Sequence, residues 1–185
     1  PDSPNQNKPD GTGPGTLVCD EERIVEQHVV SGIAYSRDEA KVAIRKVKDQ
    51  PGISASLFGP LAEADISVDM IVQNISADGS TADITFTVAR KDLRKTIEVL
   101  NGVKAKIGFS DISHSADVAK VSVVGIGMRS HAGVAAKMFR SLADKGINIQ
   151  AITTSEIKVS VLIGEAYTEL AVRALHTAYG LDAKN

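Results

Sequence analysis

The sequence predicts an α+β fold built from two ferredoxin-like modules, each an antiparallel four-stranded sheet with both helices on one face. Two observations predict it. The chain contains an internal repeat, because the stretch 51–62 matches the stretch 132–143 with Gly, Ala, Phe, Leu and Ala recurring in register. Each copy also follows the order strand, helix, strand, strand, helix, which is the order that opens a βαββαβ unit.

The first copy occupies about residues 40–115. Apolar and polar residues roughly alternate over 40–47, which predicts a half-buried strand. A helix comes next, with an apolar stripe at helical spacing made of Ile53, Leu57, Phe58 and Leu61. Pro60 is expected to kink this helix or to end it early. The remaining predicted elements are strands over 67–73 and 82–88, a hairpin turn at 77–80, a helix through 93–100 and a fourth strand over about 105–113.

The second copy, about 118–180, repeats this pattern but stops after its second helix. Its predicted elements are a strand over 120–126, a helix with the stripe Val134, Met138, Phe139 and Leu142, strands over 148–154 and 157–163, and a helix through 170–178. Without a fourth strand, the sheet of this copy would have unpaired backbone groups at one edge. The strand-like segment 28–35 precedes the first copy, and we expect it to fill that position.

These patterns predict three parts of the chain. Residues 1–26 are expected to be a linker from an upstream domain. The first module is assigned to 37–116, and the second module to 27–36 together with 117–185.

Composition excludes several classes of protein. The formal net charge of −2 gives no basic field for nucleic acid, and no apolar run is long enough to cross a membrane. The central strands carry no aromatic platform for stacking RNA bases. Cys19 is the only cysteine, which excludes a disulfide framework and favours the cytoplasm. The four histidines are scattered, so we predict neither a metal site nor a catalytic residue in this chain.

Two loops that precede helices are candidate binding sites. The loop 124–131 is glycine-rich but matches neither dinucleotide-binding nor P-loop spacing. It is either a tight turn or a site for a small carboxylate at a helix start. The loop 48–52 leads into the first helix, where free N–H groups can hold a carboxylate and Gly52 lets a ligand come close.

A small zwitterion would also need acceptors for its ammonium group. Asp49, Asp69 and the carbonyl of Gln73 are candidates at or beside the adjoining strand. The alternative interpretation is that Asp49 caps the helix and that Asp69 is a solvated surface residue.

Five stretches of the chain together resemble a known family: 49–52, 69–76, 83–87, 128–134 and 153–163. In order and spacing they are similar to the tandem ACT region of monofunctional aspartokinases, over about residues 20–180. The stretch 14–18 resembles the end of the family's kinase domain. The resemblance implies that both modules are ACT domains and that the kinase domain, with its ATP and Mg²⁺, lies upstream of this chain.

The resemblance further implies an allosteric sensor for lysine, threonine or both, working as a homodimer and acting on a kinase domain or subunit that phosphorylates aspartate. The implied effector contacts form two surfaces. The first is Asp49, Gly52 and Ser54 with Ser67, Val68, Asp69 and Gln73. The second is Val134 and Ala135 with Asn148, Ile149, Ser155 and Glu156.

Two other functions stay open at this point. One is an amino-acid-binding ACT module of a different metabolic enzyme or regulator. The other is a stand-alone acyl-phosphate hydrolase, which would need Arg129 and Asn148 to converge on an anion. The identity of the effector is also open, with a slight preference for lysine, whose far end could meet Asp69 or Glu156.

Overall fold

The computed structural model describes residues 29–126 and 133–182. Its strands are β1 (Val30–Lys48), β2 (Val68–Ile75), β3 (Thr81–Val88), β4 (Asp111–Gly125), β5 (Ile149–Thr154) and β6 (Lys158–Gly164). Its α-helices are α2 (Ile53–Glu63), α3 (Leu93–Ile107), α4 (Gly133–Ala143) and α5 (Thr168–Tyr179), and two 3₁₀ helices, η1 (Arg90–Asp92) and η2 (Glu165–Tyr167), lead into α3 and α5.

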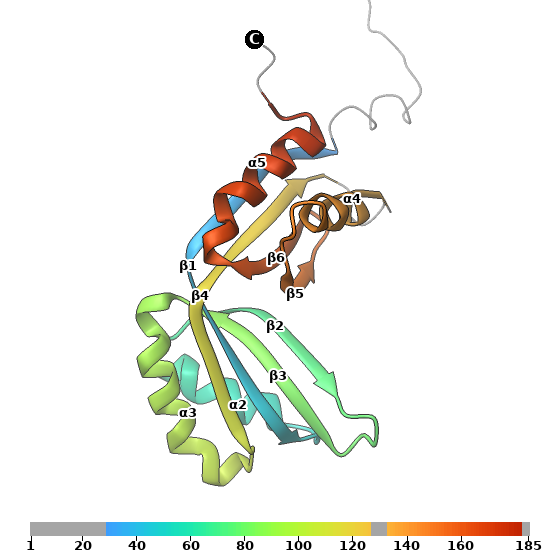
Figure 1. The fold of residues 1–185 in the computed structure, drawn as a ribbon. Coiled ribbons are helices and arrows are strands. Elements are labelled where there is room, and N and C mark those ends of the chain that lie inside the picture. Colours follow the sequence, from blue (N-terminus) through green and yellow to red (C-terminus); the bar gives the residue numbers. More distant parts are fainter. Residues whose placement is uncertain (1–28, 127–132, 183–185) are drawn as a thin grey trace, which may run out of the picture.

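Two long strands, β1 and β4, run through both modules (Figure 1). The described strands form a single antiparallel sheet in the order β2-β3-β1-β4-β6-β5. In the first module, residues 40–48 of β1 lie between β3 and the start of β4. In the second module, residues 118–124 of β4 pair with β6 on one side. Each half of the sheet therefore has the strand order of a ferredoxin-like unit.

The N-terminal strand completes the second module, as the sequence predicted. Residues 30–36 of β1 pair antiparallel with residues 120–125 of β4, in the position of the missing fourth strand. The predicted strands 28–35 and 40–47 are thus two halves of one strand of 19 residues, β1. The predicted fold class, two ferredoxin-like modules with the second completed from the N-terminus, is confirmed.

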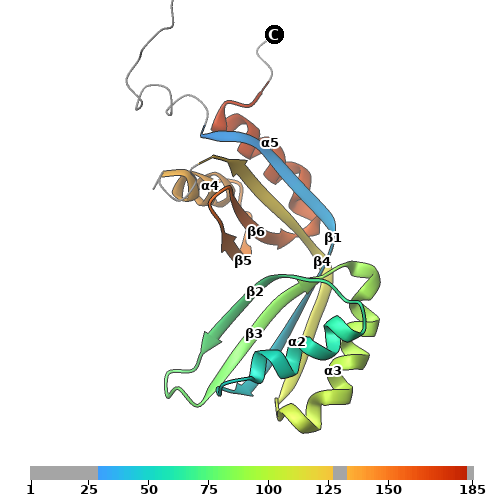
Figure 2. The same ribbon diagram turned by 180° about the vertical axis from the view of Figure 1, so that it is seen from behind.

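Each module has its own apolar core between its half of the sheet and its two helices (Figures 1 and 2). In the first module, Phe86 of β3 packs with Leu57 and Leu61 of α2 and Leu100 of α3, and all four are fully buried. In the second, Met138 and Leu142 of α4 and Leu175 of α5 fill the corresponding space. The helical stripes read from the sequence thus face these cores.

Two predictions about the first module are wrong. Helix α3 continues to Ile107, beyond the predicted 93–100, and β4 begins only at Asp111 rather than near 105. The helix continues because Ile107 extends the stripe of Thr96 and Leu100 and is buried in the same core. It ends at Gly108, whose φ of 80° gives the left-handed C-cap that favours glycine.

Helix α2 does not end early at Pro60, which was one of the two outcomes expected of this proline, but runs on to Glu63. Leu57 and Leu61, on either side of the proline, are both fully buried in the first core. This burial holds the last turn in place, and the carbonyl of Pro60 accepts a hydrogen bond from the N–H of Ala64 at 3.1 Å. Tertiary packing here outweighs the local preference of proline.

The two modules also touch along a small apolar contact, which we call the seam: Met70 of β2, Val118 of β4, Leu162 of β6 and the partly buried Ala151 of β5. The register places Leu162 on the face of the second half-sheet that is opposite to its core residues Val161 and Ile163. The seam therefore joins helix-free faces of the two half-sheets beside the shared strands.

No helix among the described residues is long and apolar enough to cross a membrane. Within the same residues, no group of three or more His, Cys, Asp or Glu side chains is placed to hold a metal ion.

Candidate functional site

An open pocket lies at the start of helix α2 in the first module. It is lined by one strand residue, Gln73 of β2, and by the loop and first turn that lead into the helix: Asp49, Gln50, Pro51, Gly52, Ile53, Ser54 and Ala55. The pocket thus brings together four of the predicted site residues, Asp49, Gly52, Ser54 and Gln73.

Backbone geometry makes the wall of this pocket a group of N–H donors. Gly52 is the N-cap of α2 and has a φ of 86°, a left-handed conformation that favours glycine. No side chain of the described residues caps this helix start, and its first turn carries no acidic residue. The N–H groups of Ser54 and Ala55 belong to the first turn, where a helix offers no acceptor of its own. A carboxylate is the group that such a helix start binds best.

Asp49 stands beside the pocket without capping the helix, because Gly52 occupies the cap position. The N–H of Asp49 donates to the carbonyl of Ser80 in the β2–β3 hairpin at 3.1 Å. This bond ties the loop to the hairpin, and the side chain of the residue stays exposed at the pocket wall. The interpretation of Asp49 as a surface N-cap is therefore wrong.

A β-bulge in β2 separates Asp69 from Gln73. Asp69 pairs with Thr87 and Val72 pairs with Thr85, so three steps along β2 match two steps along β3. Without the bulge, Asp69 and Gln73 would share one face of the sheet, because they are four residues apart. With it, Gln73 pairs with the core residue Ile84 and faces the side of helix α2, whereas Asp69 faces the helix-free side.

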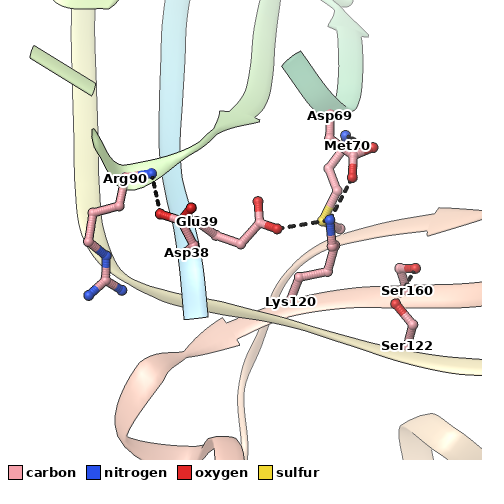
Figure 3. A network of polar contacts seen from close by, with 8 residues as sticks. All are labelled: Asp38, Glu39, Asp69, Met70, Arg90, Lys120, Ser122 and Ser160. Carbon is pink, nitrogen blue, oxygen red and sulfur yellow. Dashed lines mark hydrogen bonds and ion pairs between the residues drawn. The ribbon is translucent and has the colours of Figure 1, made fainter. Parts of the chain in front are cut away.

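Asp69 accordingly lies outside the pocket, in a network of ionic contacts beside the seam (Figure 3). Its Oδ2 accepts a hydrogen bond from Nζ of Lys120 at 2.7 Å, and its Oδ1 accepts one from the N–H of Met70 at 2.8 Å. Lys120 also pairs with Oε1 of Glu39 at 2.8 Å, and the Glu39 side chain is only 8% exposed. The prediction that Asp69 joins Asp49 and Gln73 in one site is not met within the chain.

The network shifts the pKa of two of its members. Burial acts most strongly on Asp69 and would raise its pKa, but the hydrogen bonds from Lys120 and from the N–H of Met70 outweigh it, so the pKa of Asp69 is lowered. Burial would likewise lower the pKa of Lys120, but the hydrogen bonds to Asp69 and Glu39 outweigh it, so this pKa is raised. Both residues are therefore held in their charged forms.

These shifts predict how stability depends on pH. Because the folded pKa of Asp69 lies below its ordinary 3.8, the stability it contributes is present above about pH 4 and is lost as the pH falls through the folded value. We expect the urea midpoint of wild type to exceed that of Asp69→Asn at pH 7, and the gap to narrow at pH 3. For Lys120 the sign is opposite. The stability that Lys120 contributes is present below pH 10.5, its ordinary pKa, and is lost as the pH rises through its higher folded pKa. A gap that stays constant from pH 7 to pH 3 contradicts the prediction.

Two further predicted contacts, Ser67 and Val68, stand at the start of β2, whereas Gln73 lies toward its end. At roughly 3.3 Å per residue, Ser67 and Gln73 are about 20 Å apart along the strand. Val68 is partly buried against the core of the first module. Within one chain these two residues therefore do not reach the pocket of Asp49 and Gln73.

The second predicted surface is also spread out within the chain. Asn148 and Ile149 stand at the start of β5, and Ser155 and Glu156 form the turn at its other end. In that turn the N–H of Ser155 donates to the carbonyl of Lys158 at 2.8 Å. In α4, the first-turn residue Ala135 is partly exposed, but the side chain of its neighbour Val134 points into the second core. These residues come together only if a second surface faces them.

The glycine-rich loop 124–131 falls largely outside the described residues, and so does Arg129. The part that is described, Gly125 and Ile126, is held by backbone hydrogen bonds from their N–H groups to the carbonyls of Ile157 at 2.8 Å and Val29 at 3.1 Å.

Sequence reasoning missed Glu39, Met70 and Lys120. A signal was present for Lys120, because it is the one charged residue in the otherwise uncharged and mostly apolar stretch 118–126. A charged residue in such a strand needs a partner. The sequence does not reveal which residues supply that partner, since Glu39 and Asp69 come from two other strands.

Comparison with known proteins agrees with this fold. The ACT-domain family model matches residues 42–103 and 121–179. The chain is 56% identical over 172 residues to an aspartate kinase of Stutzerimonas stutzeri, and the match covers 92% of this chain but 42% of that relative. The chain thus spans less than half the length of the curated relative that it matches.

Two solved structures match over nearly their whole length. The first, of aspartokinase alpha and beta subunits, has a TM-score of 0.76 and 52% identity, covering 82% of this chain and 99% of the matched one. The second, the ligand-free regulatory subunit of aspartate kinase from Thermus thermophilus, also has a TM-score of 0.76, with 42% identity and coverages of 81% and 98%.

Proposed function

Because this chain belongs to the tandem ACT-domain regions of aspartokinases, we propose that it binds an end-product amino acid at the start of helix α2 and thereby regulates a kinase. The observation that carries the proposal is the pocket itself. It combines uncapped N–H groups of a helix start with a carboxylate, Asp49, and an amide side chain, Gln73. These are the donors and acceptors that an amino-acid zwitterion needs at its two charged ends.

We propose that lysine or threonine is the effector. The carboxylate of the amino acid would meet the N–H groups of Ser54 and Ala55, and its ammonium group would meet Asp49 and the side-chain oxygen of Gln73. Asp69 is less suited to the far end of lysine than the sequence suggested, since Lys120 already holds its carboxylate. Glu156 on a second chain is the remaining acidic candidate for that role.

We further propose a homodimer in which a second copy closes the pocket. Both outer strands of the described sheet, β2 and β5, are edge strands with exposed apolar side chains: Ile71 and Ile75 on β2, and Ile152 on β5. Such edges favour pairing with another chain. A partner seated there would bring its own β5 and hairpin turn, with Asn148, Ile149, Ser155 and Glu156, toward the pocket of the first copy.

The regulated activity, in this proposal, is the ATP- and Mg²⁺-dependent phosphorylation of aspartate by a kinase domain or subunit, with both cofactors bound there. It is supported by the relatives, which are aspartate kinases of more than twice the matched length. This chain would supply no catalytic residue and would act in the cytoplasm. The effector would favour one arrangement of modules over another, with a coupling of about 1–3 kcal/mol.

A thermal-shift measurement tests effector binding. We expect lysine or threonine, at about 100 times its dissociation constant, to stabilise the chain by about 2.7 kcal/mol through mass action. For a chain of this size that corresponds to a rise in Tm of about 5–10 °C. Asp49→Ala and Gln73→Ala should abolish the rise, because each removes a partner of the ammonium group.

Asn74→Ala is the matched control, since Asn74 is the neighbour of Gln73 on β2 but pairs with Asp83 and points to the other face of the sheet. It should leave the rise intact. Methionine is the control ligand, because its side chain carries neither the ammonium group of lysine nor the hydroxyl group of threonine. The proposal fails if neither lysine nor threonine raises the Tm, or if the rise survives both pocket variants.

A further inference from the structure

Strand β2 carries the pocket residue Gln73 on one side of its bulge and the seam residues Asp69 and Met70 on the other. We propose that Asp69 and Met70 are positioning residues. Their contacts with the second module stabilise the bulge of β2, and the bulge keeps the side chain of Gln73 in the pocket of the first module. Effector affinity in the first module then depends on contacts made in the second. This inference rests on the proposed function, which it deepens.

The register of β2 against β3 decides which way Gln73 faces. Asp69 pairs with Thr87 and Gln73 pairs with Ile84, so the extra residue of the bulge lies between them. A shift of one residue moves every following side chain to the opposite face of a sheet. The bulge therefore decides whether Gln73 faces the start of α2 or the helix-free side.

The carboxylate of Asp69 holds the bulge in place. The Asp69 carboxylate accepts from the N–H of Met70 through Oδ1 at 2.8 Å and from Nζ of Lys120 through Oδ2 at 2.7 Å (Figure 3). Lys120 belongs to β4 and is itself held at 2.8 Å by Glu39 of β1. One carboxylate thus ties the bulged backbone of β2 to the two strands that both modules share.

Met70 has an unfavourable backbone conformation at the bulge. Its φ of 49° is in the left-handed region, which is unfavourable for a residue with a side chain and persists only where the surroundings fix it. Met70 is 3% exposed and packs against Val118 of β4 and Leu162 of β6. The second module, through Leu162, therefore supplies packing that keeps the bulge in place.

The repeat offers a matched comparison within the chain. Strand β5 has its own bulge, between Ile149 and Ala151, and the side chain of Gln150 in that bulge accepts a hydrogen bond from Lys41 of β1. Lys41 and Lys120 occupy equivalent positions in the two modules. Lys41 pairs with Thr87 in the first module, and Lys120 pairs with Leu162 in the second. Gln150 is therefore a contact between the modules that resembles Asp69 but does not lie on the strand of Gln73.

Calorimetric titration of the full chain with lysine and with threonine tests the proposal. We expect Asp69→Ala and Met70→Ala each to weaken binding about tenfold, within the usual range of coupling between sites. Met70→Leu should restore the affinity to about wild type, because leucine fills the same space. Asn74→Ala, which changes β2 outside the bulge and faces away from the pocket, should change the affinity less than about twofold. Wild-type affinity in folded Asp69→Ala and Met70→Ala, or an equal loss in Asn74→Ala, overturns the proposal.

A second measurement needs no ligand, which separates this inference from the proposed function. In the wild type, NMR should show the cross-strand backbone nuclear Overhauser contacts between Gln73 of β2 and Ile84 of β3 that their pairing requires. These contacts should disappear in Asp69→Ala and Met70→Ala and persist in Gln150→Ala. Should either alanine variant fail to fold, Asp69→Asn, which keeps an acceptor for the N–H of Met70, takes its place with a smaller loss of intensity expected.

The outcomes are then distinct. If wild type binds neither amino acid while the Gln73 contacts respond to the variants as expected, the proposed function fails and the positioning role stands. If wild type binds and the Gln73 contacts persist in all variants, the proposed function stands and the positioning role is wrong.

Discussion

Removal of residues 1–36 is expected to unfold the second module while the first stays folded. The deletion takes away the strand segment 30–36 that pairs with residues 120–125 of β4. It also removes Val30 and Ile33, which pack against the second core. Losing two partly buried aliphatic side chains costs about 3 kcal/mol, a large share of the stability of a small module. The backbone groups of β4 that faced the lost strand become an open edge.

Hydrogen exchange measures this module by module. Amides of β5, β6 and α5 should exchange rapidly in the shortened chain, whereas those of β2, β3 and α3 should keep most of their protection. A chain lacking only residues 1–26 is the matched control, because it retains the whole of β1, and it should protect both modules as wild type does. Equal protection of the two modules in the chain without residues 1–36 contradicts the prediction.

Substitution of Lys120 by methionine is expected to have the second large effect. The Glu39 side chain is 8% exposed and Lys120 holds it at 2.8 Å. Without the lysine, the carboxylate of Glu39 is left buried and has lost its ionic partner. Breaking one side of such a buried pair typically costs about 3–5 kcal/mol, because the remaining charge has lost its water and gains nothing in return.

Chemical denaturation at pH 7 measures the loss, and two variants interpret it. Replacing both partners, Glu39→Met with Lys120→Met, should recover most of the stability, since an apolar pair of similar volume is often neutral or better. Lys91→Met, at an exposed lysine of η1, is the control for loss of a surface charge and should stay within about 0.5 kcal/mol of wild type. A single Lys120→Met variant as stable as the control contradicts the assignment of Lys120 as a structural charge.

The elements of each module could be predicted because their signals are local. The stripe of Ile53, Leu57 and Leu61 fixes helix α2, and turn residues around Gly79 mark the β2–β3 hairpin. Because the second copy repeats the pattern of the first, the same elements could be predicted there. Helix α3 runs past its predicted end to Ile107, and helix α2 runs past Pro60, for one reason: burial in a core shared with distant residues extends both helices beyond what their own sequence favours.

The site was only partly predictable, because the β2 bulge is not a local property. Strict alternation is broken here, because Met70, Ile71 and Val72 are all apolar, but this run does not show where an extra residue is inserted. Asp69 and Gln73 were therefore expected to act together. The bulge exists because contacts with Lys120 and Leu162, which are 50 or more residues away in the chain, hold it. By contrast, Asp49, Gly52 and Ser54 lie within one loop and helix start, and their neighbourhood follows from the chain itself.

Because strand β1 belongs to both modules, the order in which the chain leaves the ribosome matters. The segment 30–36 emerges first, but its partner, residues 120–125 of β4, is completed 89 residues later, counted from 36 to 125. At roughly 5–20 residues per second, this interval lasts about 4–18 s. During that time the first module can be completed, since its last strand contacts end at Ser115, while the N-terminal segment has no partner in its own sheet. A nascent chain of this design carries an unpaired strand segment ahead of the first module until the second copy of the repeat is made.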